Sequence, residues 1–518
     1  MSPGFLVFNF FLFTGIVSAQ KSPIYENLPV GKYAVGFKII TLTDSSRVTK
    51  PEYNYLGEKN DGDRLRRISI HLWYPAKYNP AKQTLNYGYY CYSSSLSATN
   101  EQIADDKKNN QLNNGKSSVE RWFGKTTDDA WQKLVSMPML AQPEAIPLRE
   151  KFPLLIGILR SLSTSVTNEL LASNGYVVAM INSEDADTFS RSALLEIPDM
   201  QFALNYLKRI EGIDMNTIGT FGFSGSGFSQ VLFSMYDYRV KAVADIESGI
   251  YMDVLYQSFS ASNYYDPAKL QVPFLHIFSC DLSKQEKYIA DFEQKTKFSK
   301  RYRLIINQPA LHHWDFAAEG YASCIVLKMR GAEQINIQHS FEIASVYLLN
   351  FFNAELKKDA AALTFLSGKP ALPQIQPTLW DITVLNAGRR SPDRAELENI
   401  IRKKGIEQAM DIVRNTLKND SATNITTWYY MNQLGYTFLQ EQKYREAIEI
   451  FKLNTEMHPG DANLFDSLAE GYELSGDKEN MKKVSEIIMG LLNKKAGLSD
   501  ADKGIKGNAE KRLTVQSK

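Results

Sequence analysis

The chain has 518 residues, of which 44% are hydrophobic, 12% aromatic and 23% charged, a composition typical of a globular protein with a sizeable core. Its 59 Lys and Arg residues are balanced by 58 Asp and Glu residues, so neither a nucleic acid nor an anionic membrane surface is the expected partner. The three cysteines (Cys91, Cys280 and Cys324) exclude a disulfide framework. Without an HExxH or C-x-x-C motif, a zinc hydrolase is disfavoured, and we expect no metal and no cofactor.

The first nineteen residues have the pattern of a secretory signal peptide. An apolar, Phe-rich run over residues 4–17 is followed by Val17-Ser18-Ala19, with small residues where signal peptidase cuts. The run is shorter than the roughly 20 residues needed to span a bilayer, which argues against a membrane anchor. We therefore predict a signal peptide over 1–19 and a secreted or periplasmic protein with no membrane span after cleavage.

Residues 25–362 are predicted to form an α/β domain. Short apolar strands alternate with helical patterns, as in βα units built around a mostly parallel sheet. Apolar residues on both faces of several strands indicate a sheet covered by helices on each side. The expected strands lie at 68–74, 154–158, 176–181, 217–221, 242–246, 274–278 and 302–306.

Three further segments are set apart by composition. Residues 93–118 are rich in Asn, Ser and Lys and are predicted to be a mobile insertion. Residues 363–392 contain several prolines and are predicted to be a linker. An all-helical domain is expected over 393–495, and the Lys- and Gly-rich residues 496–518 are expected to be a flexible tail.

The helical domain has the pattern of tetratricopeptide repeats, which are helical hairpins of about 34 residues. Counting from Trp428, the consensus positions are occupied by Leu434, Gly435, Phe438, Ala447, Phe451 and Pro459. The next unit keeps Leu468, Ala469 and Tyr472 but loses the consensus of its second helix. Such a module serves either for packing or for binding a protein or peptide partner.

The clearest chemical signal is a strand-to-helix turn at Ser224. A nucleophile elbow requires small residues two positions before and two after the nucleophile, because the turn is too tight for side chains. Gly222 and Ser226 occupy these positions, so the motif is G-x-S-x-S. Ser226 as the nucleophile, an inert turn and a phosphate-binding loop are weaker interpretations.

A serine nucleophile needs a base, and a base needs an acid to orient it. Of the six histidines, His312 and His313 follow the last predicted strand, where this fold places the base; the other four lie in strands, in a helical pattern or in the repeat domain. Glu247 and Asp281 each follow a strand between the serine and the histidines. Spacing alone leaves both pairs of alternatives open.

Six segments, in this order, resemble the secreted platelet-activating-factor acetylhydrolase and dienelactone-hydrolase branch of the α/β-hydrolases: RISIHLWYPA, KFPLLIGILRS, LLASNGYVVAMI, IGTFGFSGSG, DYRVKAVADIESG and HHWDF. The resemblance implies an α/β-hydrolase fold with Ser224 as nucleophile. It also implies His313, within an H-x-x-F pattern, as base, and Glu247 at the position of the branch's aspartate. Because glutamate is longer by a methylene, Asp281 stays an alternative acid.

The oxyanion turn departs from that branch. Where the branch has a Gly-rich turn, this chain has Leu159-Arg160-Ser161-Leu162-Ser163. By position, the backbone N–H groups of Ser161 and Gly225 would hold the oxyanion, and loss of one such donor typically costs about 10²–10³ in rate. Arg160 is expected either to bind an anionic group in the site or to be a surface arginine.

Together these features predict a secreted serine esterase that acts on small-molecule esters of short or medium acyl groups through an acyl-enzyme. Residues 93–118 and 122–148, the latter with Trp131, Met137 and Met139, are expected to cover the mouth of its site. A serine peptidase is the alternative enzyme, and a degenerate hydrolase that serves as a protein-interaction scaffold is the non-catalytic alternative.

Overall fold

In the computed structural model the described residues are 22–48, 59, 65–160, 163–183, 189–250, 252–281, 286–388, 394–419 and 427–514. The predicted signal peptide therefore lies outside the described residues. The chain forms two compact units, one ending at Gly388 and the other beginning at Arg389. Each is described by itself.

The first unit is built on one ten-stranded sheet with the order β10-β9-β8-β7-β6-β4-β5-β2-β1-β3. The central strands β5, β4, β6, β7, β8 and β9 are parallel to one another. β10 is antiparallel to β9, β2 is antiparallel to β5 and β1, and β3 is parallel to β1. The strands are β1 (Ala34–Val48), β2 (Leu65–Ala76), β3 (Ala141–Pro143), β4 (Phe152–Ile158), β5 (Val177–Ser183), β6 (Ile213–Phe223), β7 (Val240–Ile246), β8 (Phe274–Ser279), β9 (Arg301–Ile306) and β10 (Trp380–Leu385).

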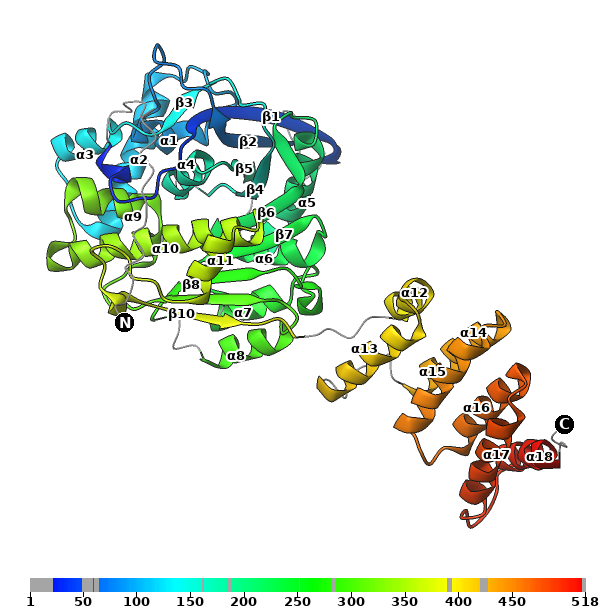
Figure 1. Cartoon of the computed structure of the whole chain (residues 1–518). Coiled ribbons are helices and arrows are strands. Elements are labelled where there is room, and N and C mark those ends of the chain that lie inside the picture. Colours follow the sequence, from blue (N-terminus) through cyan, green and yellow to red (C-terminus); the bar gives the residue numbers. More distant parts are fainter. Residues whose placement is uncertain are drawn as a thin grey trace, which may run out of the picture. The chain divides into compact units, whose positions relative to one another are not determined.

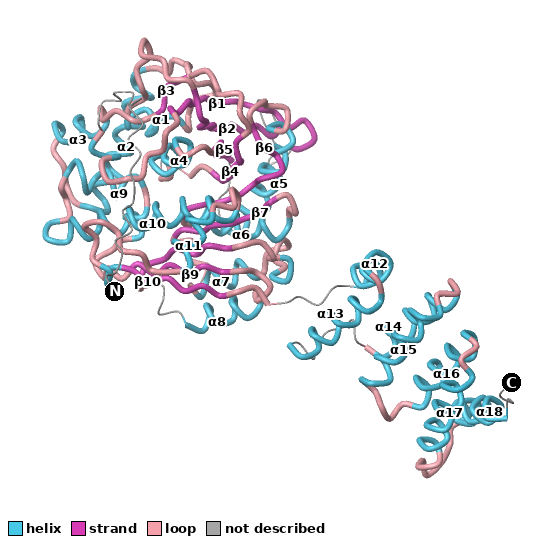
Figure 2. Tube along the Cα trace, in the orientation of Figure 1, coloured by secondary structure: helices cyan, strands magenta, loops and turns pink. Residues whose placement is uncertain are grey.

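Helices cover both faces of this sheet, and a separate apolar core lies on each face. One face is covered by α4 (Ser165–Ser173), α10 (Gln334–Glu355) and α11 (Ala360–Ser367), and Figures 1 and 2 show α10 and α11 lying across the sheet. The other face is covered by α5 (Phe189–Leu207), α6 (Gly225–Tyr236), α7 (Asp253–Ser260) and α8 (Glu286–Lys295). This is the strand order and layering of an α/β-hydrolase fold.

All seven predicted strands are present, and three strands were missed. The polar segment 93–118, predicted to be mobile, instead contributes most of helix α2 (Asp105–Phe123), between α1 (Tyr87–Ser93) and α3 (Asp128–Val135). The predicted linker 363–392 differs as well, because it holds the end of α11 and β10, which extends the sheet beside β9. A short helix α9 (Ala318–Ala322) follows the 3₁₀ turn η4 (His313–Phe316).

The buried carboxylate of Glu169, on α4, joins this helix to three other segments of the unit. It accepts hydrogen bonds from the hydroxyls of Tyr25 and Tyr90 at 2.5 Å each. The N–H groups of Leu140 and Ala141 donate to it at 2.6 and 3.2 Å. Four donors from three separate segments compensate the desolvation of this group, and burial still raises its pKa.

The second unit is helical throughout its described residues. Its helices are α12 (Arg394–Lys404), α13 (Ile406–Asn419), α14 (Trp428–Gln440), α15 (Tyr444–Met457), α16 (Ala462–Ser475), α17 (Lys478–Leu492) and α18 (Asp500–Thr514). The tail predicted to be flexible thus contains a helix. Arg512 of α18 is buried and binds Asp466 at 2.5 Å and Glu473 at 2.8 Å, so α18 is fixed to α16. Across both units, no described helix has the length and apolar character that crossing a bilayer requires.

Helices α14 and α15 cross closely at Gly435. A Cβ atom on this glycine would overlap the ring of Phe451, whereas one on Gly490, in the last turn of α17, would meet nothing within 4 Å. Both positions are helical, so alanine gains intrinsic helix propensity at each, about 0.5–1 kcal/mol in a helix interior and less in a last turn.

We therefore predict opposite effects of the same substitution. Gly435→Ala should lower the free energy of unfolding of the helical unit by about 1–3 kcal/mol through overpacking, whereas Gly490→Ala should raise it slightly. Urea unfolding of the full chain, followed by far-UV circular dichroism, measures both. Equal shifts in the two variants would contradict the close crossing.

Candidate active site

The turn between β6 and α6 places Ser224 in a backbone conformation that L-residues rarely adopt. Its φ is 57° and its ψ is −136°, and α6 begins at the next residue. The Ser224 N–H donates to the carbonyl of Ile246 on β7 at 2.9 Å, and the Ser224 carbonyl accepts from the N–H of Gly227 at 2.9 Å. These bonds hold the strained residue from both sides, as a nucleophile elbow requires.

Ser226 closes this turn from within. Its hydroxyl accepts a hydrogen bond from the Phe223 N–H at 3.0 Å and donates to the Phe223 carbonyl at 2.6 Å. A Cβ on Gly222 would lie 2.6 Å from the backbone nitrogen of Gly227, so a glycine is required there. Ser226 is buried with its hydroxyl engaged, which argues against it as the nucleophile and explains why serine fits the last motif position.

The structure brings His313 to Ser224. The His313 Nε2 lies 2.8 Å from the Ser224 Oγ, although the two residues are 89 positions apart. The imidazole stacks on the ring of Phe223 at 4.7 Å, and the edge of Trp314 packs against it at 5.6 Å. Burial lowers the pKa of His313 to about 4, so the ring is neutral at neutral pH and can accept a proton.

His312, the alternative base, lies elsewhere. Its side chain is exposed and has the ring of Phe123 6.4 Å away. Its backbone N–H donates to the Asp315 carboxylate at 2.8 Å, within the turn that begins with His313. Burial and the nearby Arg330 guanidinium lower its pKa. The structure therefore separates the two histidines that the sequence left as alternatives.

Glu247 directly follows β7 and has a positive φ of 53°. Its buried carboxylate accepts hydrogen bonds from the Ser279 hydroxyl at 2.6 Å and from the Ser279 N–H at 3.1 Å. Its pKa is raised to about 7, mainly by burial and in part by the charges of Asp245 and Asp281. The two hydrogen bonds from Ser279 act in the opposite direction and lower it. In the described part of the chain, no hydrogen bond joins Glu247 to His313.

Asp281, the alternative acid, is exposed beyond the end of β8. Because it interacts electrostatically with Glu247, both carboxylates lie near the same edge of the sheet. Burial distinguishes the two carboxylates, because the acid that orients a catalytic histidine is usually buried beside it. Ser279, which holds Glu247, was not singled out from the sequence; its position at the end of β8 was the available signal.

Of the two predicted oxyanion donors, Gly225 is the first residue of α6, so its N–H has no acceptor within the helix. Ser161 lies outside the described residues. The neighbouring Ser163 is tied to α9, because its carbonyl accepts from the Ala318 N–H at 2.7 Å and its hydroxyl donates to Glu319 at 3.2 Å. Helix α9 thus fixes the end of this turn.

Arg160 points to helix α5 and not to Ser224. Its guanidinium binds the buried carboxylate of Glu196, which also accepts the hydroxyl proton of Ser229 on α6. The arginine is therefore occupied by an ion pair, and the interpretation as an anion-binding group in the site is not supported.

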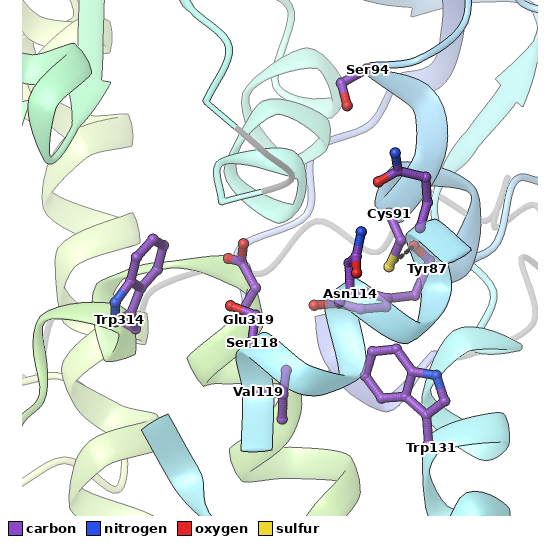
Figure 3. Close-up of a pocket in the computed structure, with 11 residues that line it drawn as sticks. Tyr87, Cys91, Ser94, Asn114, Ser118, Val119, Trp131, Trp314 and Glu319 are labelled. Atoms are coloured by element: carbon purple, nitrogen blue, oxygen red, sulfur yellow. Dashed lines mark hydrogen bonds between the residues drawn. The ribbon is translucent and has the colours of Figure 1, made fainter. Parts of the chain in front are cut away.

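A cavity of about 250 Å³, shown in Figure 3, reaches the surroundings of the Ser224–His313 pair through one lining residue, Trp314. Trp314 belongs to both, since it packs against His313 and lines the cavity. The remaining walls come from α1, α2, α3 and α9, through Tyr87, Cys91, Ser94, Gln111, Asn114, Gly115, Ser118, Val119, Trp131 and Glu319. Of the residues expected over the mouth, Trp131 lines the cavity; helix α2, from the polar insertion, forms one side.

Among the described residues, no group of three or more His, Cys, Asp or Glu side chains lies where it could hold a metal ion.

No protein-family model matches the chain, and no curated protein matches it. Among solved structures, it is similar to a ferulic acid esterase from Streptomyces cinnamoneus, with a TM-score of 0.46 and 18% identity over 69% of this chain and 98% of that chain. The fold assignment therefore rests on the strand order and the turn geometry described above.

The strained backbone at Ser224 should lower the free energy of unfolding. Ser224→Gly should be more stable than Ser224→Ala by about 1–2 kcal/mol, because only glycine adopts this conformation at little cost while both variants lose the hydroxyl. Chemical denaturation of the two variants measures the difference. A Ser224→Ala protein as stable as Ser224→Gly would show that the turn is not strained.

Proposed function

We propose that this protein is a serine hydrolase that cleaves carboxylic esters through an acyl-enzyme intermediate. The observation that carries the proposal is the 2.8 Å contact between the Ser224 Oγ and the His313 Nε2 on a strained strand-to-helix turn. A serine hydroxyl is a weak nucleophile, and a neutral imidazole at this distance can remove its proton as it attacks.

The reaction then follows from the geometry. The Ser224 Oγ bonds to the ester carbonyl carbon as its proton passes to the His313 Nε2. The Gly225 N–H, with a second N–H proposed at Ser161, stabilises the oxyanion. The bond to the alcohol breaks as His313 returns the proton to the leaving oxygen, and water then repeats the sequence to release the acid and restore Ser224.

We assign Glu247 as the residue that orients His313 and stabilises its protonated form. Its burial, its position one residue past β7 and the resemblance to the acetylhydrolase and dienelactone-hydrolase branch support this assignment over Asp281. The alternative is a non-catalytic interaction scaffold. It is favoured by one observation: in the described residues, Glu247 bonds Ser279 and not His313.

We further propose that the helical unit is a tetratricopeptide module that packs or binds a partner protein or peptide. The close crossing of α14 and α15 at Gly435 supports this, since the repeat places a small residue there. Secretion or periplasmic location is proposed from the apolar run and small residues of the first nineteen positions.

A fluorophosphonate probe tests the central proposal. Wild type should be labelled on Ser224, Ser224→Ala should not be labelled, and His313→Ala should react about 10⁴-fold more slowly because the nucleophile loses its base. Site-resolved mass spectrometry gives the position and the rate. His312→Ala is the matched control and should react like wild type. A folded wild type that stays unlabelled would favour the scaffold.

The pH dependence tests the acid. The active form needs neutral His313, present above pH 4, and ionised Glu247, present above about pH 7. In wild type, kcat/KM for p-nitrophenyl acetate should therefore fall as the pH drops through about 7. Glu247→Gln should lose that limb and keep the fall near pH 4, on a plateau lowered by about 10⁴-fold. Asp281→Asn should keep the limb but shift it to slightly lower pH, because the charge that helps to raise the pKa of Glu247 is removed. If it loses the limb instead, Asp281 is the acid.

A further inference from the structure

The cavity of about 250 Å³ is lined mainly by polar side chains. Glu319 contributes a carboxylate, Gln111 and Asn114 contribute amides, and Ser94 and Ser118 contribute hydroxyls. Binding pockets are more often lined mainly by apolar and aromatic groups. A long acyl chain in this space would desolvate these polar groups without replacing their hydrogen bonds, which is unfavourable.

One of the lining groups points to an absent ligand. The Tyr87 side chain is 1% exposed, and its hydroxyl has no hydrogen-bond partner in the described part of the chain. Buried hydroxyls are nearly always hydrogen-bonded. Tyr87 lines the cavity with Glu319, which is close enough to raise the pKa of its hydroxyl further than burial alone (Figure 3).

The charge of the lining restricts the ligand. Glu319 contributes a carboxyl group, and the eleven lining residues include no Lys, Arg or His. An anionic ligand would therefore find no cationic side chain among these lining residues. A neutral group with several hydroxyls fits better: it can donate to Glu319, bond the amides of α2 and accept from Tyr87. The indoles of Trp131 and Trp314 offer apolar faces for its C–H groups.

We propose that this cavity binds a neutral, hydroxyl-rich group of glycerol or single-sugar size, and that this group is the alcohol part of the ester that Ser224 cleaves. The proposal rests on the proposed function. Trp314 links the cavity to the catalytic histidine. It packs against His313, which must protonate the departing alcohol, and so the cavity lies on the leaving-group side.

The test compares acetate esters that differ only in the alcohol: methyl 6-O-acetyl-glucoside and monoacetylglycerol, against hexyl acetate and acetylcholine. Wild type should hydrolyse the two polyol esters with a kcat/KM about tenfold or more above the hexyl ester. Tyr87→Phe should raise KM for the polyol esters about five- to tenfold, the effect of one hydrogen bond, and should change KM for hexyl acetate less.

Tyr92→Phe is the matched control, because Tyr92 lies on the same helix α1 and does not line the cavity. Equal kcat/KM for polyol and hexyl esters would overturn the proposal, as would a preference for acetylcholine, which would indicate a cation site. An equal effect of Tyr87→Phe on every ester would overturn it too.

Two measurements separate this proposal from the proposed function. If wild type reacts with the fluorophosphonate but shows no alcohol preference, only the cavity assignment fails. If wild type does not react, equilibrium dialysis of methyl 6-O-acetyl-glucoside against full-length Ser224→Ala still tests the cavity. Binding that Tyr87→Phe weakens would support it, and no binding would overturn it.

Discussion

The candidate site depends on the backbone of Ser224, held at φ 57° between a strand and a helix. A non-glycine residue in such a conformation costs about 1–3 kcal/mol, so the surrounding structure must enforce it. The enforcing bond comes from the neighbouring strand, where the Ile246 carbonyl accepts the Ser224 N–H. Since Phe223 pairs with Ile246 in the register of β6 and β7, Ser224 and Glu247 leave the sheet side by side at its carboxyl edge.

Burial then sets the charges of the site. Desolvation favours the neutral form of both groups, lowering the pKa of His313 to about 4 and raising that of Glu247 to about 7. Between these values neither side chain is charged, and a neutral pair attracts weakly. Above about pH 7 Glu247 is ionised, and the two hydrogen bonds that Ser279 donates to it favour this form. In the proposed reaction, the imidazolium that forms when His313 takes the proton of Ser224 would be stabilised by this ionised carboxylate.

The sequence predicted the features that depend on local pattern and missed those that depend on which surfaces meet. The central strands are continuous apolar runs, and the residues that form the Ser224 turn are adjacent in the sequence. The edge strand β10 follows a Pro-containing stretch that resembles a linker, and α18 is held by ion pairs from Arg512 to two residues of α16. Such cross-element partners leave no periodic signal, and the Ser279 contact with Glu247 was missed for the same reason.

Helix α2 shows how function can explain a segment whose composition predicts mobility. Of its nineteen residues, all described, Val119 is the one that is buried, so apolar burial holds the helix only weakly. The exposed pairs of Lys116 with Asp128 and of Glu120 with Lys125 add little. Its amides nevertheless face a cavity opposite Glu319. A ligand that bonds both walls would stabilise α2, and by linkage a firmly placed α2 would tighten that ligand by the same factor. Polar side chains on the cavity side of α2 are therefore what the proposed hydroxyl-binding wall requires.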